Sequence, residues 1–153
     1  MATRTIEVAS VTTASPEEVW ALLSDITSWP RWGLWEEARV ETPGAQEPQG
    51  LGAIRYMQAD RMKTTEEIYI YEPPHHLAWL QLKTNAPVRN YRSDVQLTPI
   101  PDGGTQINWR ASYESKIFGV GWMLDRSFKL FLADSARRLA LAAAGRDDEI
   151  EDD

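Results

Sequence analysis

The 153-residue sequence contains no cysteine and only two histidines, which are the adjacent His75 and His76. The absence of cysteine excludes a disulfide-stapled fold, a thiolate zinc site and a cysteine nucleophile. The two histidines follow a Pro-Pro pair in a turn, and neighbouring side chains there point in different directions, so they do not predict a metal site. The sequence also lacks a Walker loop, a dinucleotide-binding glycine motif and an ordered Ser/His/Asp set. We therefore expect neither a metal nor a cofactor.

Long apolar runs and clustered basic residues are missing as well. No stretch approaches the ~20 apolar residues of a membrane span, and residues 1–7 lack the apolar segment of a secretory signal. Most of the formal net charge of −7 falls on residues 146–153, which hold six acids and one base. Phosphate binding needs clustered Lys and Arg, so no nucleic-acid partner is expected. We expect a cytoplasmic protein with one domain over residues 1–145 and an acidic, disordered tail over 146–153.

The first part of the chain predicts a strand followed by two short helices. Residues 4–12 alternate between apolar and polar, as in a half-buried strand. Ser15, Pro16 and Glu18 then form a capping box with proline at the first helical position, which marks a helix start. Pro30 stops a long helix, so a short second helix or turn is expected there.

The rest of the chain predicts six neighbouring strands and a final long helix. The strands are expected at 37–42, 51–57, 62–71, 77–84, 88–98 and 105–115. Apolar residues then recur every three or four positions without proline over 117–144, which indicates one amphipathic helix. This order predicts an α+β fold with a seven-stranded antiparallel sheet and the helices on one face. A helix is only ~10 Å across, so one helix cannot fill the concave side of a curled seven-stranded sheet. Either large side chains fill the remaining space, or a cavity is left.

Three sets of residues form motifs of a known kind: residues 15–25 with 29–32, residues 71–74 followed by 77–79, and residues 101–105 followed by Trp109. Together they resemble the polyketide cyclase/dehydrase branch of the START-like (SRPBCC, helix-grip) superfamily. The similarity extends over about residues 4–144. It implies a bacterial-type single domain with the helix-grip fold, in which a seven-stranded curved antiparallel sheet wraps around a long C-terminal helix, with two short helices after the first strand. The matching residues serve capping, turns and core, so they leave the function open.

The expected ligand-binding residues are large side chains predicted to face the cavity: Trp32, Trp35, Ile68, Ile70, Tyr91, Trp109, Tyr113, Leu124, Phe128 and Phe131. Resemblance places the tryptophans of residues 29–35 at one end of the cavity, as a lid or as a packed plug. Glu66, Tyr91 and Tyr113 are the candidates for proton transfer. Glu66 faces inward if Ile68 and Ile70 do, because the three share one parity; otherwise it lies at a solvated strand start.

Three functions fit this pattern. The first is binding of a small hydrophobic ligand, of the lipid, polyketide or isoprenoid type, between the sheet and the C-terminal helix. The alternative is a polyketide cyclase/dehydratase-like enzyme that acts by folding its substrate and transferring protons. A protein-interaction module ranks last, because the pattern predicts no large exposed apolar patch. The sequence leaves the ligand's identity, turnover and the oligomeric state open.

Overall fold

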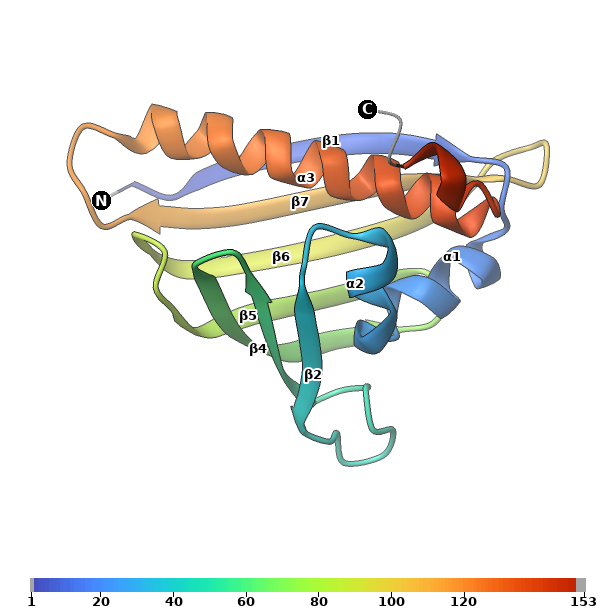
Figure 1. Ribbon diagram of the computed structural model, residues 1–153, viewed down its shortest axis with the longest axis horizontal. Helices are drawn as coiled ribbons and strands as arrows, with labels where there is room; N and C mark the ends of the chain where they lie inside the picture. The colour runs from blue at the N-terminus through green and yellow to red at the C-terminus, as the bar shows by residue number, and fades with distance from the viewer. Residues whose placement is uncertain (1, 151–153) are drawn as a thin grey trace.

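The computed structural model describes residues 2–150. Figure 1 shows a curved antiparallel sheet with the long C-terminal helix lying along one side of it. The strands are β1 (Arg4–Thr12), β2 (Glu37–Thr42), β3 (Ile54–Ala59), β4 (Met62–Glu72), β5 (His76–Thr84), β6 (Val88–Pro99) and β7 (Thr105–Ser115). The helices are α1 (Pro16–Leu23), α2 (Trp29–Trp32) and α3 (Gly121–Ala143), with the 3₁₀-helices η1 (Ile26–Ser28) and η2 (Asp147–Glu149).

The sheet order is β1-β7-β6-β5-β4-β3-β2, and every neighbouring pair is antiparallel. The first strand therefore pairs with the last, and α1 and α2 carry the chain from β1 to the opposite edge of the sheet. This confirms the predicted α+β helix-grip fold with seven strands, two short helices after β1 and a long C-terminal helix. No helix within residues 2–150 is long and apolar enough to cross a membrane.

The capping box at α1 forms as predicted. The Ser15 hydroxyl accepts from the Glu18 backbone N–H at 3.2 Å, and the Ser15 N–H donates to Glu18 Oε1 at 3.1 Å. Pro16 occupies the first turn, where its missing N–H leaves no hydrogen bond unmade. The start of α1 is thus set locally, and the helix buries Val19 and Leu23 in the core.

The long helix α3 lies over one edge of the sheet, along β1 and β7. It begins at Gly121, four residues later than predicted. The Thr12 hydroxyl donates to the Ala140 carbonyl at 2.8 Å and anchors the C-terminal half of α3 to β1. Because α3 follows this edge, tryptophan side chains rather than the helix fill the middle of the sheet's concave face.

A bulge in β4 changes which residues face the core. Ile68 pairs with Trp79 and Ile70 with Ala78, so Tyr69 has no partner on β5. Ile68 is buried, Ile70 is only partly buried, and Tyr71 packs on Trp20 at 5.5 Å between ring centroids. The predicted alternation across residues 68–71 is therefore wrong, because the extra residue shifts the parity of the strand.

The predicted disordered tail is also corrected over residues 146–150. Asp147–Glu149 form η2, and Ile150 is 5% exposed within the core. Burial of the apolar Ile150 side chain is favourable, and this stabilises the folded conformation of the acidic segment around it. Residues 151–153 of the predicted tail lie outside the described residues.

Candidate functional site

A pocket opens on the concave face of the sheet, between the strands and the N-terminal half of α3. Aromatic side chains supply most of its wall, and two methionines and a few small or polar residues supply the rest. The lining residues are Trp29, Trp35, Met57, Met62, Glu66, Trp79, Gln81, Ala86, Val88, Tyr91, Ser93, Trp109, Phe128, Phe131 and Leu132.

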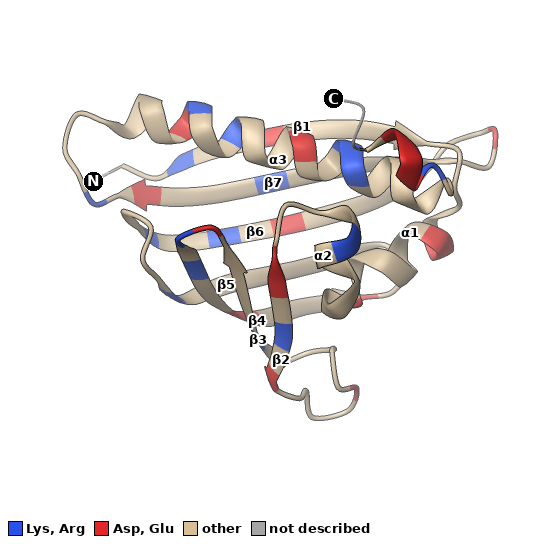
Figure 2. Ribbon diagram, in the orientation of Figure 1, with Lys and Arg blue, Asp and Glu red and all other residues tan. Residues whose placement is uncertain are grey.

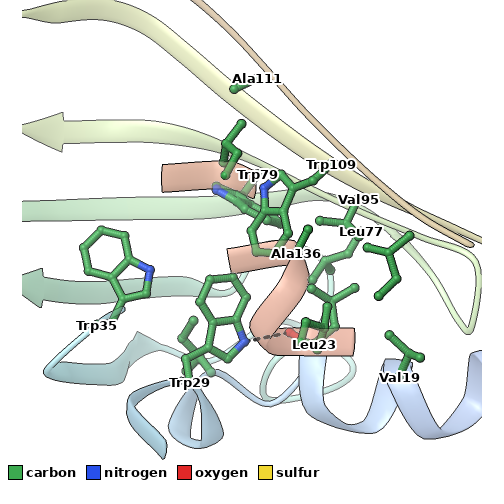
Figure 3. Packing of buried hydrophobic residues seen from close by; sticks show 14 of the residues in the cluster. Val19, Leu23, Trp29, Trp35, Leu77, Trp79, Val95, Trp109, Ala111 and Ala136 are labelled. Carbon is green, nitrogen blue, oxygen red and sulfur yellow. Dashed lines mark hydrogen bonds between the residues drawn. The ribbon is translucent and has the colours of Figure 1, made fainter. Parts of the chain in front are cut away.

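Tryptophans from three parts of the chain meet at the inner end of the pocket. Trp29 of α2 packs against Trp79 of β5 and Trp109 of β7, with each pair of ring centroids 5.8 Å apart and close to edge-on. The Trp29 indole N–H donates to the Leu23 carbonyl at 3.0 Å, a bond drawn in Figure 3. Edge-to-face packing of this kind is favourable beyond simple burial, so we expect this inner wall to be rigid.

The enclosed space measures about 40 Å³. A water molecule needs about 10–15 Å³ of such space, so about three water molecules fit. One benzene ring occupies a cavity of about 150 Å³. A ligand must therefore widen the pocket, and we expect the partly buried lining side chains Met62, Phe128 and Phe131 to move when it does.

A row of polar side chains lies on three adjacent strands, and two of its members, Glu66 and Gln81, line the pocket. Arg55 of β3 lies opposite Glu66 of β4, and Glu66 lies opposite Gln81 of β5. Arg55 Nε donates to Glu66 Oε1 at 3.1 Å, and the two side chains are only 4% and 3% exposed. We call Arg55, Glu66 and Gln81 the polar row.

The Arg55 guanidinium is held between two indoles. Its carbon lies 4.5 Å from the Trp79 ring centroid and 5.0 Å from that of Trp29. A cation over an aromatic face gains electrostatic energy that partly offsets its lost hydration. Burial raises the pKa of the Glu66 carboxyl, while the guanidinium of Arg55 and the indole N–H of Trp79 act in the opposite direction.

Two polar atoms of this row have no hydrogen-bond partner among the described residues. They are Arg55 Nη2 and Gln81 Oε1, and both are buried. The amide nitrogen of Gln81 donates to the Thr64 hydroxyl at 2.6 Å. Gln81 lines the pocket and Arg55 does not. Because buried polar atoms are nearly always paired, Gln81 Oε1 is the point where water or the polar group of a ligand can bond.

Tyr91 brings a hydroxyl to the same pocket. Its ring stacks on Tyr113 with 6.0 Å between centroids and contacts Phe128 at 5.6 Å. Burial, and then the nearby Glu66 carboxylate, raise the pKa of Tyr91 well above its usual range. A hydrogen bond with Ser93 acts in the opposite direction on this pKa, but burial outweighs it, so the Tyr91 phenol is neutral at pH 7 and has Ser93 beside it.

Tyr113 and Asp125 form a separate network behind the pocket wall. The Tyr113 hydroxyl donates to Asp125 Oδ1 at 2.5 Å, and Arg4 donates to both Asp125 oxygens at 2.9 and 2.7 Å. The hydrogen bond from Arg4 is the main reason that the pKa of Asp125 is lowered. Burial and the Asp125 carboxylate raise the pKa of Tyr113. This hydroxyl is fully engaged and does not border the pocket.

The structure divides the predicted site residues. Those that line the pocket are Trp35, Tyr91, Trp109, Phe128, Phe131 and the proton-transfer candidate Glu66. Those outside the lining are Trp32, Ile68, Ile70, Tyr113 and Leu124. Trp32 is fully buried and donates its indole N–H to the Ser28 hydroxyl at 3.1 Å. Of the tryptophans in residues 29–35, Trp32 is therefore packed as a plug, while Trp29 and Trp35 form pocket wall.

Sequence reasoning missed Arg55, Gln81 and Ser93. Arg55 shares the inward-facing parity of the buried Ala53 and Met57. The alternation along β3 therefore already indicated that the Arg55 side chain faces the core. Ser93 donates to the Arg110 carbonyl at 2.9 Å and accepts from the Trp109 indole N–H at 3.0 Å. It thereby fixes the orientation of a pocket wall.

Comparison with known proteins agrees with this architecture. Residues 3–144 match the family described as polyketide cyclase / dehydrase and lipid transport. The chain belongs to this family. No protein with a curated description is matched.

Solved structures show the same fold at low sequence identity. A START superfamily protein from Mycobacterium smegmatis has a TM-score of 0.75 and 13% identity, with 95% of this chain and 98% of that chain covered. The protein XoxI from Bacillus cereus has a TM-score of 0.73 and 18% identity, with 93% and 95% covered. Ara h 8.0201 has a TM-score of 0.73 and 10% identity, with 94% and 99% covered. At these identities, the likeness concerns the fold and not the ligand.

Proposed function

We propose that the protein binds a small hydrophobic molecule, of the lipid, polyketide or isoprenoid type, in the pocket between the sheet and α3. The observation that carries this proposal is a pocket with many aromatic side chains in its wall, lined also by Gln81, whose buried Oε1 has no partner among the described residues. Ligand pockets typically combine apolar walls with a few placed polar groups. The family match supports a role of this kind.

The polar row narrows the chemistry of the ligand. Gln81 lines the pocket, and its unpartnered Oε1 accepts a hydrogen bond. A site that leaves such a group unpaired disfavours a purely hydrocarbon ligand. The preferred ligand therefore has a flat or flexible apolar body and one hydroxyl group at its buried end.

Tryptophan fluorescence tests this proposal, because Trp29, Trp35, Trp79 and Trp109 line the pocket. Titration with hydroxylated anthraquinones, flavonoids, farnesol and fatty acids is expected to quench the emission with saturation and to raise the melting temperature for at least one class. The 2-naphthol and naphthalene pair isolates the hydroxyl group, and 2-naphthol is expected to bind more tightly.

A blocked pocket provides the control. Ala86→Trp places an indole at the pocket wall and is expected to abolish saturable quenching. Ala133→Trp adds the same side chain at an exposed position of α3 outside the pocket lining and is expected to leave binding unchanged. If both variants bind like the wild type, or if no ligand class binds, the pocket is not a ligand site.

A second candidate function rests on Glu66 and Tyr91. Both border the pocket, and burial raises the pKa of each. In a cyclase/dehydratase-like reaction, the Glu66 carboxylate removes a proton from a carbon between two carbonyl groups, and the Tyr91 hydroxyl donates a hydrogen bond to the resulting enolate. Turnover of a linear polyketide thioester surrogate that Glu66→Gln abolishes and Tyr91→Phe slows favours this function. Binding without turnover favours the carrier.

A further inference from the structure

The junction between β7 and α3 exposes large apolar side chains. Phe118 is 91% exposed and Trp122 is 63% exposed, and Ile117 and Met123 are each half-exposed. This corrects the expectation that the chain has no large exposed apolar patch. We call Ile117, Phe118, Trp122 and Met123 the apolar tip. Contiguous exposed apolar residues are uncommon on soluble monomers and mark interaction sites.

The outward face of α3 extends this surface with basic residues. Trp122, Arg126, Lys129 and Leu130 follow one another at intervals that place them on one side of a helix, and all are exposed. The opposite side carries Phe128 and the other residues that pack on the sheet. The outward face therefore combines an indole and a leucine with two cations, as in helices that lie at a membrane surface.

The local charge is positive although the chain as a whole carries −7. Between Lys116 and Ala133 the only acid is Asp125, and Arg4 neutralises it through an ion pair of 2.7 Å. Lys116, Arg126 and Lys129 form no ion pair with residues 2–150. Figure 2 shows positive positions along the N-terminal half of α3.

We propose that the apolar tip, together with Lys116, Arg126 and Lys129, binds the surface of an anionic lipid bilayer. Trp and Phe favour the boundary between headgroups and acyl chains, and cations near them are attracted by anionic headgroups. Figure 1 shows that the loop between β7 and α3 lies at one end of the molecule, so it can reach a flat surface. A second copy of the chain would instead bring the same three cations face to face across a two-fold axis.

Sedimentation with vesicles tests the proposal on the full-length protein. Binding is expected to vesicles of equimolar phosphatidylglycerol and phosphatidylcholine, and only weakly to phosphatidylcholine alone. Each Lys or Arg changed to Gln among the three cations is expected to weaken binding about five-fold. Raising NaCl from about 0.05 to 0.5 M shortens the range of electrostatic attraction and is expected to release the protein.

The apolar contribution has a matched control. The Phe118→Ser/Trp122→Ser double variant removes exposed side chains and is expected to weaken vesicle binding at least about ten-fold, while its melting temperature stays close to that of the wild type. The Val11→Ser/Leu51→Ser double variant removes apolar side chains that are 62% and 59% exposed elsewhere, and it is expected to bind like the wild type.

The fluorescence of Trp122 also shows directly whether this side chain inserts into the bilayer. Trp122 is the only exposed tryptophan, because the other six are 8% exposed or less. Vesicles that contain brominated lipid are expected to quench part of the emission of the wild type and none of that of Trp122→Phe. Three results would overturn the proposal: no sedimentation with anionic vesicles, equal sedimentation of the tip variant, or tip-dependent self-association without vesicle binding. Ligand binding in the pocket is measured separately, so either proposal can fail alone.

Discussion

Replacing Glu66 with leucine tests whether the polar row is a coupled ion pair inside the core. In Glu66→Leu, the Arg55 guanidinium stays charged at 4% exposure but loses the carboxylate 3.1 Å away. Breaking a buried pair in this way costs about 3–5 kcal/mol. At about 2–4 °C per kcal/mol for a chain of this size, the melting temperature is expected to fall by about 6–20 °C.

Two further variants complete a double-mutant cycle with Glu66→Leu, and their stabilities are expected to differ. Arg55→Met leaves Glu66 buried alone, and Arg55→Met/Glu66→Leu replaces the whole pair with apolar side chains. Exchange of a buried pair for apolar residues is often neutral or stabilising, so the double variant is expected to be at least about 2 kcal/mol more stable than either single variant. This recovery measures the coupling between the two residues.

The pH dependence distinguishes the two single variants. Without Arg55, the pKa of Glu66 in the folded state lies further above its usual 4.5, because burial is then opposed only by the Trp79 indole N–H. The folded state then binds the proton more tightly than the unfolded state, so the destabilisation is largest at high pH and disappears as the pH falls through the folded pKa. Arg55→Met is therefore expected to recover stability as the pH falls from neutral toward the usual 4.5 of the carboxyl. Glu66→Leu is not, since an arginine keeps its proton.

Urea unfolding followed by tryptophan fluorescence measures all four proteins. The reasoning is refuted if Glu66→Leu is within about 1 kcal/mol of the wild type at neutral pH. It is also refuted if the losses of the two single variants simply add in the double variant.

Three further predictions concern other parts of the fold. Ser15→Ala removes the capping box of α1 and is expected to lower the free energy of unfolding by about 1 kcal/mol, measured by urea unfolding; no loss would show that the cap is not formed in solution. Asp125→Asn weakens the bonds to Arg4 and Tyr113 and is expected to lose about 1 kcal/mol near neutral pH. Because the pKa of Asp125 is lowered in the folded state, the wild type loses this contribution as the pH falls below the usual 3.8, and the variant should be less stable than the wild type at pH 7 but not in strong acid. Phe128→Ala is expected to destabilise by about 2 kcal/mol and to tighten naphthalene binding by enlarging the pocket; weaker binding in calorimetry would contradict this.

Local sequence patterns determined the order and kind of the elements. Alternation, the Ser15–Glu18 capping box and the three-to-four spacing of α3 each involve residues within a few positions of one another. Such short-range preferences can be read without knowing where the rest of the chain lies. The orientation of Glu66 stayed open at this level, because its parity with Ile68 allowed an inward side chain while a solvated strand start was the alternative; the structure buries it.

The tertiary structure decided which residues line the pocket. A bulge in β4 moved Ile70 off the inward face, and the path of α3 along β1 and β7 put Tyr113 and Leu124 behind the wall rather than in it. The exposure of Trp122 has the same origin, because helical periodicity does not say which face meets the sheet and which meets solvent, and Phe118 lies in the turn before α3. The sequence by itself determined the order and kind of the elements through preferences between near neighbours, and the family resemblance implied the helix-grip arrangement. Only the packing of distant segments decided which side chains surround the cavity, because that choice balances the burial of many side chains at once.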